Sequence, residues 1–108
     1  CDWSSIAFDF LALCKPTIFL DVKPPFQNGF SLGKEYRFGA IAEDMESLQV
    51  ALESSLNDAN SFMAAHRESY RSVLKSVYGD NTDGRSGQRQ LARLEKLLKK
   101  HTLAAGRF

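Results

Sequence analysis

Hydrophobic residues dominate the first part of the chain. Ser4 and Ser5, residue types that often begin helices, precede an almost wholly apolar segment at positions 6–13. A helix this short and apolar is expected to be buried on most sides. Lys15-Pro16 ends it, because proline cannot continue a helix. Positions 17–22, TIFLDV, are nearly continuous in hydrophobicity, which is typical of a strand covered on both faces in a parallel sheet.

A helix, a tight turn and a buried strand in this order predict the second half of a βαβ crossover. The first strand of that crossover is expected immediately before Cys1. Positions 23–37 carry two prolines and two glycines among aromatic residues, which predicts a loop with a functional role. FGAIA at positions 38–42 then predicts a short edge strand.

Three helices are predicted after this strand. Asp44 caps the first, the second follows NDANS at 57–61 and ends near Gly79, and the last starts after GDNTDG at 79–84 and frays beyond His101. Their apolar positions are, in chain order, Met45, Leu48, Leu52, Leu56, then Phe62, Val73, Leu74, Val77, then Leu91, Leu94, Leu97, Leu98. The sequence therefore predicts an α/β part at 1–42 and a helical part at 43–108.

Composition narrows the possible functions. A chain of 108 residues is one small domain or a piece of a larger one, and a net charge of +1 favours neither nucleic acid nor an acidic tail. Cys1 and Cys14 are too few for a disulfide framework or a metal site, and Cys14 is expected to be a small buried side chain in a reducing compartment. No apolar stretch is long enough to span a membrane, so we expect a cytoplasmic protein. We also expect no metal and no cofactor.

The two serines at the first helix have two interpretations. If a strand ends just before them, they lie where a doubly wound sheet delivers the chain to a ligand crevice. Backbone N–H groups and serine hydroxyls there would suit a diphosphate, and Asp9, one turn later, could accept a bond from a ribose hydroxyl. A serine before a helix also commonly serves only as a cap, so both interpretations stay open.

The stretch CDWSSIAFDFLALCKPTIFLDV resembles a pattern found near the C-terminus of the CDP-glycerol glycerophosphotransferases, the teichoic-acid polymerase and primase family. That pattern is D-[YW]-S-S-x-x-x-D-x-x-x-x-x-[KR]-P-x-[IL]-F. EYRFGAIAEDMESLQVAL and VYGDNTDGRSGQR are similar to later parts of the same family, in the same order. The family has the two-domain GT-B fold, so the resemblance implies the distal half of a Rossmann-like donor-binding domain, followed by three helices, without the N-terminal acceptor domain.

The resemblance also implies site residues and a reaction. Ser4 and Ser5 would hold the donor diphosphate, Asp2 would shape their turn, and Asp9 would bind the donor ribose. Glycerol phosphate would pass from CDP-glycerol to a lipid-linked or cell-envelope polymer acceptor. Members of the family supply the histidines for general-base catalysis from other parts of their two-domain chains. His66 and His101 match no motif, so no catalytic residue is expected here, and this stretch alone is expected to be inactive and to fold poorly.

Two further features have alternative interpretations. Arg37 either reaches a phosphate across the crevice or is an exposed loop residue. The last helix is basic. It either contacts an anionic membrane or has an ordinary solvated face. In the first case the protein would be peripheral on the inner face of the cell membrane. Nucleic acid is not expected, because no aromatic residues interleave with the charges. The alternative functions are a GT-B glycosyltransferase with a nucleotide-sugar donor and a non-catalytic basic helical interaction module.

Overall fold

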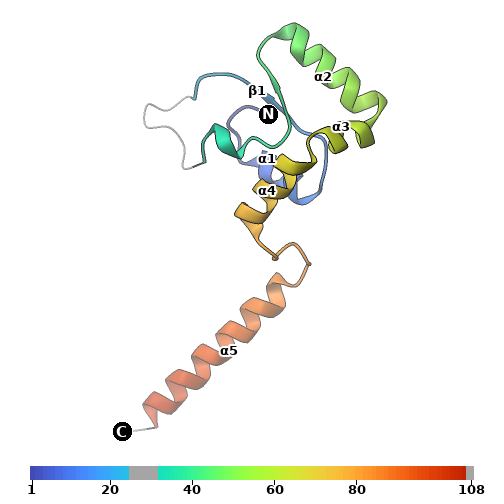
Figure 1. Cartoon of the computed structure of the whole chain (residues 1–108). Helices are drawn as coiled ribbons and strands as arrows, with labels where there is room; N and C mark the ends of the chain where they lie inside the picture. Colours follow the sequence, from blue (N-terminus) through green and yellow to red (C-terminus); the bar gives the residue numbers. More distant parts are fainter. Residues whose placement is uncertain (25–31, 107–108) are drawn as a thin grey trace. The chain divides into compact units, whose positions relative to one another are not determined.

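A computed structural model of the chain describes residues 1–24 and 32–106. It is mixed α/β and mostly helical, and it divides into two compact units, Cys1–Val77 and Tyr78–Phe108. Figure 1 shows the elements in chain order: α1 (Ile6–Ala12), β1 (Ile18–Leu20), the 3-10 turn η1 (Lys34–Tyr36), β2 (Ala40–Ala42), α2 (Met45–Asn57), α3 (Ala59–Ala65), α4 (Arg67–Tyr78) and α5 (Ser86–Ala105).

The strands β1 and β2 pair in parallel, with Phe19 opposite Ile41. On the other edge of β1, the Cys1 amino group donates to the Ile18 carbonyl at 2.7 Å, and the Leu20 amide donates to the Cys1 carbonyl at 2.7 Å. These two bonds are the pair that a residue of a parallel strand makes with its neighbour. Cys1 therefore aligns with Phe19 as a strand residue does, and α1 connects it to β1.

Aromatic side chains form the core of the first unit. Phe38 is completely buried and contacts three rings: Phe19 at 5.0 Å, Tyr70 at 4.8 Å and Phe8 at 6.2 Å between centroids. The Tyr70 hydroxyl donates to the Lys15 carbonyl at 2.6 Å, and burial raises the pKa of that hydroxyl. The core thus joins α1, β1, the segment before β2, and α4.

The first helix is less buried than its sequence predicted. Only Ala7 and Leu11, four residues apart, are buried, whereas Leu13 is 64% exposed. The expected burial of Cys14 is wrong: it is exposed, with a φ of 53°. The Lys15 amide bonds the Phe10 carbonyl at 3.2 Å, so Cys14 occupies the left-handed position of a helix-ending turn, and its side chain faces solvent.

The hydrophobicity of positions 17–22 predicted a strand covered on both faces, but β1 is fully covered on only one of them. Phe19 is buried on one face, while Ile18 and Leu20 on the other are half-buried. Leu48 and Leu52 of α2 and Phe10 of α1 line a hollow of about 390 Å³ over that second face. Continuous hydrophobicity predicted burial here, but the described residues cover this face only in part.

Local signals placed the later helices well. Asp44 caps α2 as predicted, because its side chain accepts from the Ser47 amide at 2.7 Å and the Ser47 hydroxyl accepts from the Asp44 amide at 3.1 Å. The second predicted helix is two, α3 and α4, with Asp58 capping α3. The end of α4 at Tyr78 is confirmed, since Gly79 follows with a φ of 57°.

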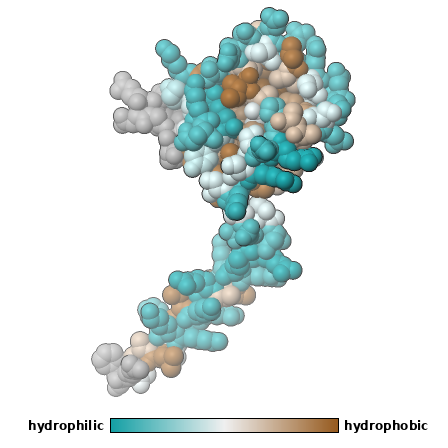
Figure 2. All heavy atoms as spheres, in the orientation of Figure 1, coloured by the Kyte–Doolittle hydropathy of each residue, from teal (hydrophilic) through white to brown (hydrophobic). Residues whose placement is uncertain are grey.

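The second unit contains the 20-residue helix α5. The helix was predicted to fray after His101 but continues to Ala105. None of its residues is buried, so its leucines, expected to form an apolar face, are all exposed. Figure 2 shows hydrophobic side chains among hydrophilic ones along this helix.

Candidate functional site

The turn that leads into α1 is held mainly by backbone and aspartate contacts. The Asp2 carboxylate accepts from the Ser4 amide at 3.1 Å, which gives Asp2 the turn-shaping role that was predicted for it. The Ser4 hydroxyl accepts from the Ile6 amide at 3.4 Å, a long bond. Ser5 occupies the N-cap position with helical backbone angles and makes no side-chain cap bond. The Ser5 hydroxyl therefore does not cap α1, although Ser5 occupies the N-cap position.

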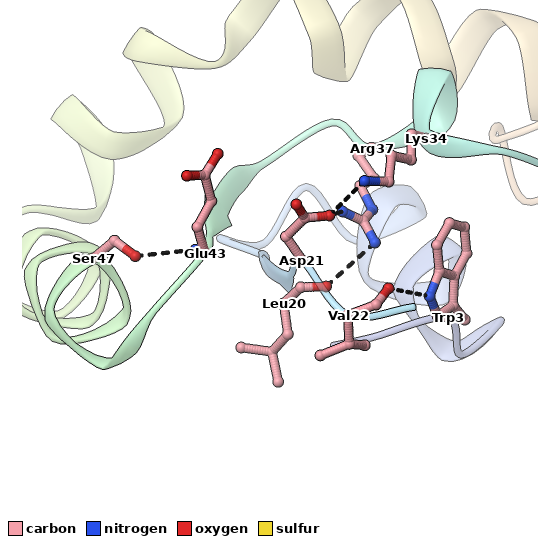
Figure 3. A network of polar contacts seen from close by, with 8 residues as sticks. All are labelled: Trp3, Leu20, Asp21, Val22, Lys34, Arg37, Glu43 and Ser47. Atoms are coloured by element: carbon pink, nitrogen blue, oxygen red, sulfur yellow. Dashed lines mark hydrogen bonds and ion pairs between the residues drawn. The ribbon is translucent and has the colours of Figure 1, made fainter. Parts of the chain in front are cut away.

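Arg37 lies at the carboxyl end of β1, where it is fixed by two acceptors. Its guanidinium bonds the Asp21 carboxylate at 3.0 Å and the Leu20 carbonyl at 3.2 Å. Lys34 bonds the same carboxylate oxygen at 2.7 Å, and Figure 3 shows both cations converging on Asp21. The Arg37 side chain is only 4% exposed, so its interpretation as an exposed loop residue is wrong.

Trp3 connects the serine turn to this charged cluster. Its indole N–H donates to the Val22 carbonyl at 2.8 Å, just beyond the end of β1 (Figure 3). The Arg37 guanidinium lies 4.6 Å from the Trp3 ring centroid and 5.9 Å from that of Phe19, within the range of cation–π attraction. We call Trp3, Asp21, Lys34 and Arg37 the strand-end cluster. It holds the segment before Ser4 against the end of β1.

The structure brings some of the predicted site residues together. Trp3, Ser4 and Arg37 line one small hollow of about 30 Å³, room for about one water molecule. The Arg37 Nε in this region is buried and has no hydrogen-bond partner among the described residues. Ser5 and Asp9 are exposed and do not line the hollow. They are four residues apart at the start of α1, however, and so are neighbours on its exposed surface.

Sequence reasoning missed the partners of Arg37. Asp21 follows β1 directly, and a charged residue at the carboxyl end of a predicted parallel strand was a usable signal. Lys34 gave none, because it lies in a loop and contacts Asp21 across 13 residues of sequence. The part of the loop at 25–31 was also assigned a functional role, and it lies outside the described residues.

The strand-end cluster predicts an acid-sensitive Trp3. The hydrogen bond from Lys34 has the largest effect on the pKa of Asp21, and the hydrogen bond from Arg37 the next largest. Both lower this pKa below its ordinary value of 3.8. Because the pKa of Asp21 is lower in the folded than in the unfolded protein, the ionised carboxylate stabilises the folded state at pH values above 3.8. This stabilisation is lost as the pH falls through the lowered pKa. We expect Trp3 fluorescence to change over this acid range in the wild-type protein but much less in Asp21→Asn. An unaltered acid transition in the variant would contradict the assignment to Asp21.

Neither histidine joins this site. His66 ends α3, and its ring packs on Phe62 at 4.9 Å between centroids, in accord with a structural role. His101 lies exposed on α5. Within residues 1–24 and 32–106, no cluster of three or more His, Cys, Asp or Glu side chains could hold a metal ion.

The comparisons with known proteins leave the resemblance as a prediction. No protein-family model, curated protein or solved structure matches the chain. Within the residues that the structure describes, no helix combines the length and the hydrophobicity needed to cross a membrane. The functional assignment therefore depends on the residues at 2–19 and on the geometry of the turn.

Proposed function

We propose that the chain is the distal half of the nucleotide-donor-binding domain of a GT-B-type transferase. The enzyme would move glycerol phosphate from CDP-glycerol to a lipid-linked or cell-envelope polymer acceptor. The resemblance of residues 2–19 to the glycerophosphotransferase pattern supports the choice of donor. The absence of a suitable histidine supports the view that the acceptor side and the catalytic base belong to other parts of the enzyme.

The pairing of Cys1 with β1 is the observation that carries this proposal. Because Cys1 is bonded to Ile18 and Leu20 in the parallel pattern, the Ser4-Ser5 turn starts at the carboxyl-end edge of the sheet. Ligands of open α/β sheets bind outside the carboxyl ends of the strands. Arg37 lies at the same edge, where β1 ends. The turn and this arginine thus occupy the edge that a donor nucleotide would use.

Each residue has a distinct role in this proposal. The Ser5 hydroxyl, which makes no cap bond, and the Ser4 hydroxyl would donate to the donor diphosphate. Asp9, exposed one turn along α1, would accept from a ribose hydroxyl. Arg37 would supply positive charge near the phosphates, and Asp21 would orient it. An acceptor hydroxyl would attack the β-phosphate, form the new phosphodiester and expel CMP, with its proton taken by a base from outside this chain.

Replacing Ser5 with alanine is expected to weaken CDP-glycerol binding about tenfold, the usual cost of one hydrogen bond to a charged group. The melting temperature should not change, because no cap bond is lost. Trp3, the single tryptophan, is two residues away and reports binding by fluorescence, with titration calorimetry as a second measurement. Ser72→Ala, an exposed serine on α4, is the matched control.

The same titrations separate the alternatives. Tight binding of CDP-glycerol and CDP, weakened in Asp9→Ala, would support the proposed donor and the ribose contact. Preference for a UDP-sugar would favour the nucleotide-sugar glycosyltransferase. If none of these ligands binds and Ser5→Ala changes nothing, the donor-binding proposal fails. The interaction module would then be favoured, and the exposed leucines of α5 are the observation that supports it.

A further inference from the structure

The helix α5 presents an apolar stripe that the described residues do not cover. Leu91, Leu94, Leu97 and Leu98 are between 43% and 66% exposed. With about 100° between successive residues, these four leucines fall within an arc of roughly 120°. Exposed leucines gathered on one side of a helix leave a face that binding to another surface would remove from water.

Basic side chains occupy the other side of α5. Arg93, Lys96 and Lys100 fall on an arc opposite Leu91, Leu94 and Leu98, and Lys99 lies beside the stripe. Arg89 also lies on the basic side, but it is paired with Asp83 at 2.8 Å. The helix carries a single acidic residue, Glu95. Its polar side is thus strongly cationic, with three charges that make no ion pair among the described residues.

The positive charge of the protein is concentrated in the second unit. Tyr78–Phe108 contains seven Lys and Arg against three Asp and Glu, a formal net charge of +4. Cys1–Val77 contains seven against ten, a net charge of −3. The small overall charge therefore conceals a basic segment that coincides with the exposed leucines.

A coiled coil between two copies would be another use for the stripe, but the sequence does not favour it. Leu91, Leu94 and Leu98 follow heptad spacing, yet the next seam position is His101. A stable coiled coil needs about three or four such heptads. Leu97 also widens the stripe beyond the narrow seam of a coiled coil, so the stripe fits a broad apolar surface better than a second helix.

We infer that α5 binds anionic lipid surfaces, with its leucines in the acyl boundary and its basic side toward the headgroups. Positive charge attracts the helix to an anionic surface, and burial of leucine side chains holds it there. This inference uses no residue of positions 1–77, so it does not depend on the donor site.

Vesicle flotation with the full chain tests the inference. The vesicles are phosphatidylcholine alone or with about 30 mol% phosphatidylglycerol, and far-UV circular dichroism checks that each variant stays folded. We expect the wild-type protein to bind the anionic vesicles and not the neutral ones, and high salt to weaken binding. Removing three basic charges with Arg93→Gln, Lys96→Gln and Lys100→Gln should lower the partition coefficient on the order of 100-fold.

Matched controls separate the two contributions. Lys15→Gln, Lys23→Gln and Lys75→Gln remove the same charge from the first unit and should have little effect. Leu98→Gln should weaken binding roughly tenfold, because it removes a leucine of the stripe. Leu103→Gln replaces a leucine on the basic side that is somewhat more exposed than Leu98, and it should change binding less than about twofold. Absence of binding to anionic vesicles, equal binding to neutral ones, or indifference to Leu98→Gln would each overturn the inference.

Discussion

Replacing Phe38 with alanine is expected to lower the free energy of unfolding of the first unit by about 3–5 kcal/mol. Phe38 is 0% exposed and contacts the rings of Phe8, Phe19 and Tyr70. Truncation would leave a cavity among them that the surrounding backbone cannot close fully. Its carbonyl also accepts from the Ser69 hydroxyl at 3.0 Å, so a shift of this segment would strain the contact with α4.

Urea denaturation followed by Trp3 fluorescence measures this loss. Phe10→Ala is the matched control, because Phe10 is 43% exposed and its removal opens no enclosed cavity. We expect the control to cost less than about half as much as Phe38→Ala. Equal losses for the two phenylalanines would contradict the assignment of Phe38 as the centre of the core.

Replacing Gly39 with alanine is expected to destabilise the first unit by about 3 kcal/mol or more. A Cβ at this position would lie 1.8 Å from the carbonyl oxygen of Thr17 and 2.8 Å from its carbonyl carbon. Both are backbone atoms at the start of β1, so no side-chain rotation relieves the overlap. The strands β1 and β2 would have to separate at the point where they begin to pair.

Gly87→Ala is the control for this substitution. No atom lies within 4 Å of a Cβ built at Gly87, which is near the start of α5. Alanine should favour the helix there by up to about 1 kcal/mol, seen as a gain in far-UV circular dichroism. If Gly39→Ala unfolds at the same denaturant concentration as the wild-type protein, then close packing of the two strands is not what requires glycine.

The strand-end cluster has a consequence for the donor proposal. Arg37 is nearly buried, and a buried cation is retained only when acceptors replace its water. Asp21 and the Leu20 carbonyl supply acceptors for the two terminal nitrogens of the guanidinium, which also lies near the rings of Trp3 and Phe19. The segment before Ser4 is therefore held in a defined position, which would reduce the entropy lost when a ligand binds at the turn.

The part of the fold that sequence could predict is the part set by neighbouring residues. Asp44 and Ser47 cap α2, Gly79 ends α4, and Lys15-Pro16 follows α1, because each signal acts over one or two turns of the chain. The β-forming residues at 17–22 and the short apolar stretch at 38–42 were sufficient to place β1 and β2. The turn-shaping role of Asp2, which the family resemblance implied, also depends on a contact over two residues, the bond from the Ser4 amide.

Contacts between distant residues required the tertiary structure. Arg37 and Asp21 are 16 residues apart, and nothing local distinguishes this arginine from an exposed one in the same loop. The exposure of Cys14 depends on the left-handed turn after α1 rather than on its apolar neighbours. Sequence alone indicated α1, both strands, the helical second part and the residues of the serine turn, but it merged α3 and α4 into one helix. The tertiary structure decided which charges meet and which apolar faces are covered, because burial depends on what the whole chain packs against each surface.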